Sequence, residues 1–148
     1  MSGQEAIGRG ISQQEVVTFM ERLSQTKIRM LMLASSERTP VTVLSDLSRS
    51  RSNRIRTRVT ENPKTPISIL TILASDKNQN VRIGVCDNNA TPTGLLLVLA
   101  GEECPDVRYA LAENSHVPRQ ILSLLTRDEN PYVAERAKET LIRLDDSV

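Results

Sequence analysis

Apolar residues return along this chain with a period of 26 residues, and a proline marks the start of each period. The prolines are Pro40, Pro66, Pro92 and Pro118. Counted from the proline as position one, positions four, five, eight, sixteen and twenty are apolar, as in Ile69, Leu70, Leu73, Val81 and Val85. Agreement over four successive units without a gap predicts tandem repeats that bury their apolar faces against one another.

The spacing within a unit predicts two short helices joined by a polar turn. Apolar residues at i, i+1 and i+4 favour a first helix after the proline, and apolar residues four apart favour a second. We expect a threonine to cap each first helix, with the proline at its first position; these residues are Thr39, Thr65 and Thr91. We expect each second helix to end at an asparagine in the left-handed conformation; these are Asn62, Asn88 and Asn114.

The units predict one repeat domain between two short tails. We expect a flexible tail over 1–11, a domain over 12–144 and a second tail over 145–148. Regular repeats occupy 40–65, 66–91, 92–117 and 118–144. Residues 12–39 are expected to form a degenerate capping repeat, in which Ile28, Arg29 and Met32 match the pattern if one extra residue is allowed before Pro40. The expected fold is therefore all-α, with about five two-helix repeats.

These residues resemble the leucine-rich repeat variant (LRV) family and, more distantly, HEAT repeats. The resemblance rests on the P-x-x-x-L-x-x-L spacing, the Val-Arg pair of the second helix and the asparagine before the next proline. It covers 40–144 closely and 12–39 loosely. It implies a right-handed α-solenoid in which α and 3₁₀-like helices alternate, and it implies little about function. Some members carry an iron–sulfur cluster in a cysteine-rich N-terminal segment; here no cysteine precedes Cys86, so we expect no cofactor.

Composition narrows the classes of function. With no Trp, one Phe and two Tyr, the core must be aliphatic. Two cysteines and one histidine are too few for a disulfide framework or a self-contained zinc site. No apolar run approaches the length of a membrane span, so we expect a cytoplasmic protein without a membrane partner. No catalytic constellation emerges. A HEAT-like DNA glycosylase would need aromatic residues to grip the lesion, and this chain has only Phe19, Tyr109 and Tyr132. We expect a protein that is not an enzyme.

An acid precedes the arginine of the second helix by six residues in two repeats. The pairs are Asp76 with Arg82 and Glu102 with Arg108. A planar guanidinium pairs well with a carboxylate, and the resemblance to HEAT-like folds implies a ladder of such pairs between units. We expect these four residues to form a structural ladder; a ligand-binding role for the two arginines is the alternative.

Charge is distributed unevenly. Residues 1–60 hold ten Arg/Lys and five Asp/Glu, and residues 61–148 hold nine and thirteen, so the net charges are +5 and −4. The first regular repeat has Ser50 where the others have an acid, so we expect Arg56 to point free into solvent. It would belong to a basic cluster of Arg49, Arg51, Arg54, Arg56 and Arg58. Such a cluster can bind an acidic protein surface or phosphates, or simply be solvated. The lack of interleaved aromatic residues disfavours stacking on single-stranded bases.

These features together favour a non-catalytic scaffold or adaptor that binds a protein or peptide on a concave face built by the second helices. The repeat-variable positions expected on that face are Thr57, Ile83, Tyr109 and Glu135. Two alternatives stay open. One is a nucleic-acid-binding module that uses residues 49–58. The other is self-assembly, in which the basic end of one copy meets the acidic end of another; the chain would then be a weak homo-oligomer instead of a monomer.

Overall fold

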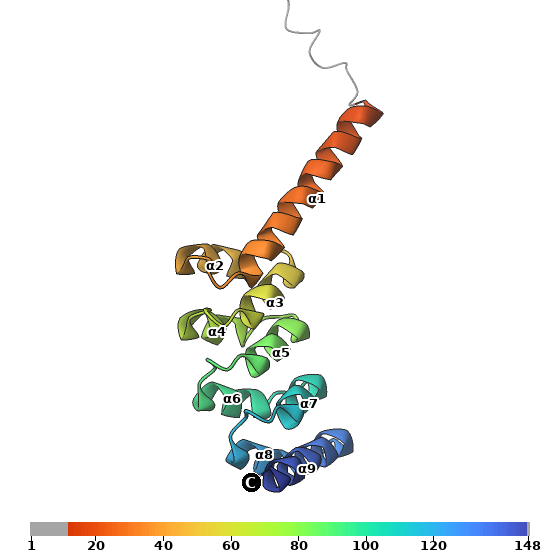
Figure 1. Cartoon of the computed structure of the whole chain (residues 1–148). Helices are drawn as coiled ribbons and strands as arrows, with labels where there is room; N and C mark the ends of the chain where they lie inside the picture. Colours follow the sequence, from red (N-terminus) through yellow and green to blue (C-terminus); the bar gives the residue numbers. More distant parts are fainter. Residues whose placement is uncertain (1–11, 148) are drawn as a thin grey trace, which may run out of the picture.

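The computed structural model describes residues 12–147, and within this range the chain is all-helical, with nine α-helices and no strand (Figure 1). The prediction of an all-α protein is confirmed for these residues. A long helix comes first, α1 (Gln13–Ser35). Four shorter helices each follow a repeat proline: α2 (Val41–Ser48), α4 (Ile67–Leu73), α6 (Thr93–Ala100) and α8 (Arg119–Leu125). Each of these first helices is followed by a second helix: α3 (Asn53–Glu61), α5 (Gln79–Asp87), α7 (Pro105–Glu113) and α9 (Pro131–Asp146).

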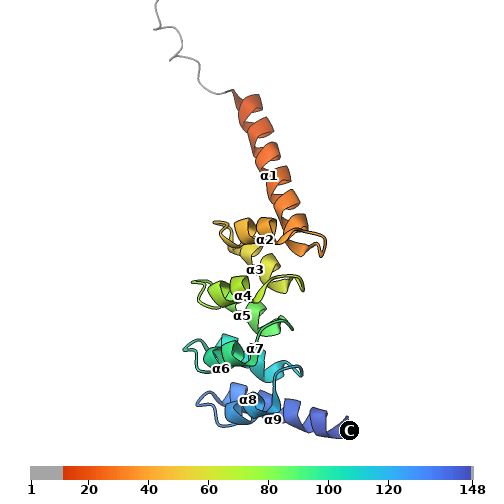
Figure 2. The ribbon, with the colours of Figure 1, turned by 90° about the vertical axis from the view of Figure 1, so that its left-hand side faces the viewer.

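The four helix pairs follow one another in chain order, and the first and second helices form two separate rows (Figures 1 and 2). Each second helix packs against the second helix of the next pair, α3 on α5, α5 on α7 and α7 on α9. The core is a continuous column of aliphatic side chains between the two rows. At the fifth repeat position, for example, Leu44, Leu70, Leu96 and Leu122 are all buried.

The threonines before the prolines do not cap the first helices. Each first helix begins one residue after its proline, and no side chain caps it. The hydroxyl of Thr65 instead donates a hydrogen bond backwards, to the carbonyl of Val59 at 2.6 Å. Thr39 and Thr91 do the same to Leu33 and Val85. These threonines therefore give a second hydrogen bond to carbonyls near the end of the preceding helix, each of which also accepts the backbone N–H of the residue that ends the helix.

The asparagines that end the second helices are extended, not left-handed. The backbone φ of Asn62 is −76°, and that of Asn88 is −79°. The side chains of Asn62 and Asn88 are buried, and each amide reaches the preceding unit. Nδ2 of Asn88 donates to the carbonyls of Thr60 and Asn62, at 2.6 and 3.0 Å. Each asparagine is thus a clamp between successive units, which the expected turn-forming role did not include.

The first unit differs from the expected degenerate repeat. Residues 13–35 form one continuous helix, and only its C-terminal end takes the place of a second helix. Thr39 and Thr65 bond to Leu33 and Val59, which are 26 residues apart. The register is therefore 26 residues without the extra residue that the sequence alignment allowed, so Ile28 and Met32 are exposed and do not occupy core positions.

Two smaller expectations are also corrected. Both helices of every described unit are α-helices, so the alternation with 3₁₀-like helices is wrong for residues 12–147. The last helix continues to Asp146, two residues past the expected end of the domain. The expected tail over 1–11 lies outside the described residues.

Candidate functional site

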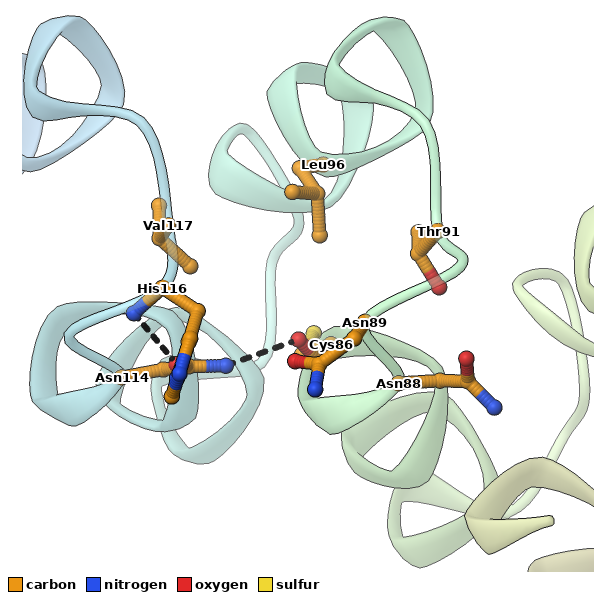
Figure 3. Close-up of a pocket in the computed structure, with 8 residues that line it drawn as sticks. All are labelled: Cys86, Asn88, Asn89, Thr91, Leu96, Asn114, His116 and Val117. Atoms are coloured by element: carbon orange, nitrogen blue, oxygen red, sulfur yellow. Dashed lines mark hydrogen bonds between the residues drawn. The ribbon is translucent and has the colours of Figure 1, made fainter. Parts of the chain in front are cut away.

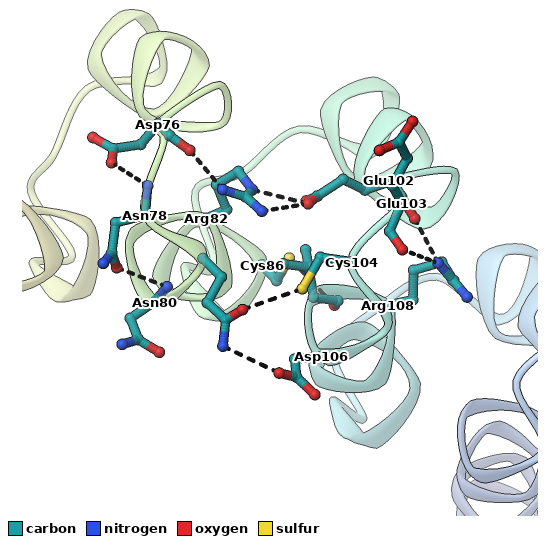
Figure 4. Close-up of polar contacts among 12 residues, drawn as sticks. Asp76, Asn78, Asn80, Arg82, Cys86, Glu102, Glu103, Cys104, Asp106 and Arg108 are labelled. Atoms are coloured by element: carbon teal, nitrogen blue, oxygen red, sulfur yellow. Dashed lines mark hydrogen bonds and ion pairs between the residues drawn. The ribbon is translucent and has the colours of Figure 1, made fainter.

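In α3, α5 and α7, a recurring arginine pairs with an acid of the next unit, 20 residues further along the chain. Figure 4 shows the pair of Arg82 with Glu102. The pairs are Arg56–Asp76, Arg82–Glu102 and Arg108–Asp128, with shortest distances of 2.6, 2.6 and 2.7 Å. Each arginine also donates from Nη1 to the carbonyl six residues before it, at the turn within its own unit. We call these three pairs the arginine ladder and each pair a rung. A rung ties the second helix and the turn of one unit to the turn of the next unit.

The arginine and the acid of each rung are largely hydrogen-bonded within the chain. In the first and third rungs the guanidinium forms a two-bond fork with both carboxylate oxygens. In the second rung both nitrogens of Arg82 donate to Oε1 of Glu102, and the buried Oε2 has no hydrogen-bond partner among the described residues. The hydrogen bond from Arg56 lowers the pKa of Asp76 below its ordinary value, although burial opposes this shift. The four predicted ladder residues all lie in this network, with Arg56 and Asp128 added. The predicted pairs Asp76–Arg82 and Glu102–Arg108 are wrong, because the carboxylate of each acid binds the arginine of the preceding unit.

Arg56 is therefore not free in solvent, contrary to the expectation. Its side chain is 8% exposed and forms the first rung with Asp76. The prediction looked for an acid six residues before the arginine, whereas the carboxylate comes from 20 residues after it. The rung that is missing is the one that would join α1 to the turn between α2 and α3. Met30 and Ser50 stand 26 residues before Arg56 and Asp76, so both partners of that rung are replaced.

The other four arginines of the basic cluster divide into two groups. Arg49 and Arg51 lie beside Lys77 around a hollow at the turn before α3. Arg54 and Arg58 lie one turn apart on α3 and line a different hollow. Arg58 also forms an ion pair with Glu61 at 2.7 Å, which partly neutralises it. The cluster is thus two smaller basic sites and not one patch of five arginines.

The four variable positions chosen from the sequence lie in one row along the second helices. Thr57, Ile83 and Tyr109 are half-buried, and Glu135 is exposed. Ile83 and Tyr109 pack against the core. The Tyr109 hydroxyl accepts a hydrogen bond from Nε of Arg136 at 2.9 Å, and the guanidinium lies 5.4 Å from the ring centroid. The row is continuous, but Ile83 and Tyr109 at its centre present only part of their side chains to a ligand, because the rest packs against the core.

Two hollows interrupt this row at equivalent positions, 52 residues apart. The first, between α3 and α5, is polar and basic, and it is lined by Asn53, Arg54, Thr57, Arg58, Glu61, Asn78 and Asn80. The second, between α7 and α9, is more apolar, and it is lined by Pro105, Asp106, Tyr109, Asn130, Tyr132 and Val133. Between them, Gln79 on α5 donates to Asp106 on α7 at 3.1 Å. The same surface thus offers two different binding chemistries at a fixed separation.

A third hollow lies at the opposite ends of the second helices, between two asparagine clamps (Figure 3). Asn88 makes two bonds to the preceding unit, whereas Asn114 makes one, to the carbonyl of Cys86 at 3.2 Å. His116 stands at the rim, and its backbone N–H donates to Oδ1 of Asn114. The hollow therefore reflects a looser clamp at this junction.

Two exposed apolar surfaces escaped the sequence predictions. The seventh repeat position is aliphatic and exposed in three successive first helices, at Ile72, Val98 and Leu124. The sequence contained a signal for this row, because an aliphatic residue precedes the leucine of position eight in three successive repeats. The second surface is α1, which carries nine exposed large apolar residues. The expected capping repeat over 12–39 would have buried these residues, so the sequence did not predict this surface.

The titratable groups offer little for catalysis or metal binding. Burial raises the pKa of the Cys86 thiol to about 12, so this thiol stays protonated and is a poor nucleophile at neutral pH. Within residues 12–147, no group of three His, Cys, Asp or Glu side chains could hold a metal ion. In the same range, no helix combines the length and the apolar character needed to cross a membrane.

Comparison with known proteins gives no match. No family model fits the chain, and neither the curated proteins nor the solved structures include a significant match to it.

Proposed function

We propose that this chain is a right-handed α-solenoid of the leucine-rich repeat variant type, and that it is a non-catalytic scaffold that binds an extended protein segment across its second helices. The repeat positions quoted above support the family, and the stacking of second helix on second helix supports the solenoid. The buried ladder and clamps leave the outer surface of these helices free for a ligand.

The observation that carries the binding proposal is the pair of equivalent hollows on α3/α5 and α7/α9. Packed helices lie about 10 Å apart, so two units separate the hollows by about 20 Å. An extended peptide rises about 3.3 Å per residue, so about six residues span that distance. The ligand would place an acidic residue beside Arg54 and a large apolar residue beside Tyr132.

Selection from a displayed library of random peptides tests this proposal. We expect enriched peptides to pair an acidic residue with an apolar one at a spacing of about six positions. Replacing Tyr132 with Ala should then weaken binding at least tenfold, about 1.4 kcal/mol. Tyr132 is 78% exposed, so this change should leave the fold intact. Arg54→Ser should weaken binding to a similar degree.

Ile72→Ser is the matched control, because Ile72 is also largely exposed (67%) but lies on the first helix α4. If no spacing is enriched, or if the selected peptides bind the Tyr132 and Arg54 variants as tightly as the parent, the proposal is wrong. A mobility-shift assay across a salt series covers the nucleic-acid alternative. Salt-sensitive DNA or RNA binding that is lost in Arg49→Ser/Arg51→Ser would favour that alternative instead.

A further inference from the structure

The helix α1 reaches beyond the stack of helix pairs. Only its C-terminal end contacts α2 and α3 (Figure 1), and Ala34 is the only buried residue in its 23 residues. Its exposed large apolar side chains are 38–68% exposed; they are Val16, Val17, Phe19, Met20, Leu23, Ile28, Met30, Met32 and Leu33. Exposed apolar surface of this extent on one helix is typical of an interaction site.

Part of this surface forms a regular seam. The residues alternate at spacings of three and four, which places them on one face of the helix; they are Val16, Phe19, Leu23, Thr26, Met30 and Leu33. This is the heptad spacing of helices that pair side by side. At its C-terminal end the seam adjoins Ala34, which packs into the core of the stack. The buried face of the stack therefore continues onto the free part of α1.

The charges beside the seam select the partner. Glu15, Arg22 and Arg29 follow one another at intervals of seven residues along one flank. If two copies of α1 pair antiparallel, each Glu15 faces Arg29 of the second copy, and Arg22 lies at the two-fold axis. A parallel pair would instead bring Arg22 beside Lys27 of the second copy, since these two flanks face each other in that arrangement. The antiparallel pair thus has two Glu15–Arg29 contacts against one Arg22–Arg22 contact at the axis, whereas the parallel pair has two like-charged Arg22–Lys27 contacts and no opposite pair between these flanks.

The same arrangement suits the rest of the molecule. With Arg22 at the axis, Leu23 of each copy packs beside Phe19 of the other, at the centre of the seam. The two stacks then extend from opposite ends of the helix pair and do not compete for space. A two-fold interface of this kind uses the same patch on both copies and closes on itself, so it gives dimers and not filaments.

We propose that this protein is a homodimer, held together by antiparallel pairing of the α1 seam with the α1 seam of a second copy. The interface is independent of the hollows on the second helices, so either proposal can fail without the other. It also differs from the head-to-tail contact of basic and acidic ends, which would join different surfaces of two copies.

Sedimentation velocity of the full chain across a wide concentration range tests the dimer. We expect a reversible dimer, and we expect Leu23→Glu to weaken it at least a hundredfold, because a charge then lies at the centre of the seam. Leu23 makes little contact within one copy (49% exposed), so circular dichroism should show an unchanged helix content. Val98→Glu, an equally drastic change on the exposed first-helix row, should leave the dimer intact. A parent chain that is monomeric throughout, or a dimer indifferent to Leu23→Glu, overturns the proposal.

Charge exchange tests the antiparallel direction. Glu15→Arg and Arg29→Glu should each weaken the homodimer, since each places like charges together twice. An equimolar mixture of these two variants should form a heterodimer about as tight as the parent, because both of its flanking pairs are then opposite in charge. Glu15 also accepts the backbone N–H of Ser12 in a capping box. Glu15→Gln is therefore the control, since it keeps an acceptor for the cap and removes the charge. Failure of the mixture to associate overturns the antiparallel pairing.

Discussion

The junction between α1 and α3 and the junction between α3 and α5 use the same clamp but differ in their ladder. At the first junction, Asn62 donates to the carbonyls of Ala34 and Ser36. At the second, Asn88 donates to those of Thr60 and Asn62, again 28 and 26 residues back. Only the second junction has a rung, because Met30 stands where an arginine would be needed at the first.

The reason for the difference lies in the turn between the helices of a unit. Each ladder arginine donates from Nη1 to a carbonyl six residues before it, as Arg56 does to Ser50 at 2.7 Å. That carbonyl is available because it lies outside the helices. The equivalent residue in the first unit is Ser24, which lies inside α1, where its carbonyl takes part in the helical ladder of hydrogen bonds. The clamp needs only the end of a second helix, whereas the rung needs a complete two-helix unit.

The largest loss of stability that we expect comes from removing the arginine of one rung, so that the junction between α7 and α9 has a methionine at that position, as the first junction does. Arg108→Met leaves Asp128 buried at 6% exposure without its partner, and it should lower the free energy of unfolding by about 3 kcal/mol. Adding Asp128→Ser removes the stranded charge and copies the Met30/Ser50 pair. A serine can still accept the N–H two residues on, as Ser50 does from Ser52. Urea unfolding of the single and double variants measures both effects.

We expect the double variant to recover most of the loss, about 2 kcal/mol. The double-mutant cycle also needs the two single variants, Arg108→Met and Asp128→Ser. Additive losses in the two single variants would show that this rung contributes no coupling between units.

A second effect follows from pH. The hydrogen bonds from Arg56 and from the backbone of Asn78 hold the pKa of Asp76 below its ordinary value. For Asp128, burial would raise the pKa, but the hydrogen bonds from Arg108 and Asn130 outweigh it. A carboxyl whose pKa is lower in the folded than in the unfolded state stabilises the fold above its unfolded pKa, about 3.9. That stability is lost as the pH falls through the folded pKa.

The free energy of unfolding should therefore fall as the pH decreases below about 4. Asp76→Asn should start less stable at neutral pH and show a shallower decrease, so that its curve approaches that of the parent in acid. Equilibrium unfolding in urea at a series of pH values checks this. Parallel curves would mean that Asp76 does not contribute to the acid sensitivity.

The repeat itself could be predicted from the sequence because its signal is periodic. Five apolar positions recur at the same places in four units, and their packing into the core follows from that pattern alone. The roles of Thr65 and Asn88 could not be predicted, because both side chains bond to groups that only stacking brings near. Local propensity assigned the threonine to the helix after it and the asparagine to a turn, whereas tertiary contacts decided both.

The first unit was misjudged for a different reason. Ile28 and Met32 match the apolar pattern only if one extra residue is allowed, and this match favoured the wrong register. In the correct register, Met30 and Ser50 stand where the arginine and the acid of a rung would be. Residues 24–27 also contain neither Gly nor Pro, so nothing in them ends a helix. The sequence could also place a candidate binding face on the second helices. It could not predict the two hollows, because each is lined by side chains of two units whose packing the sequence pattern does not specify.

The smallest effect is the most informative about the first junction. Met30→Arg with Ser50→Asp would place a rung where none exists, and we expect it to stabilise the contact of α1 with the stack by less than about 1 kcal/mol. The gain should fall short of a native rung, since the carbonyl of Ser24 stays committed to α1 and the new arginine lacks its third hydrogen bond. Hydrogen exchange of the amides near Ala34, together with urea unfolding, measures the gain, and Met30→Arg alone is the control. A gain equal to the net loss in the Arg108→Met/Asp128→Ser double variant would show that the turn carbonyl is not needed for a rung.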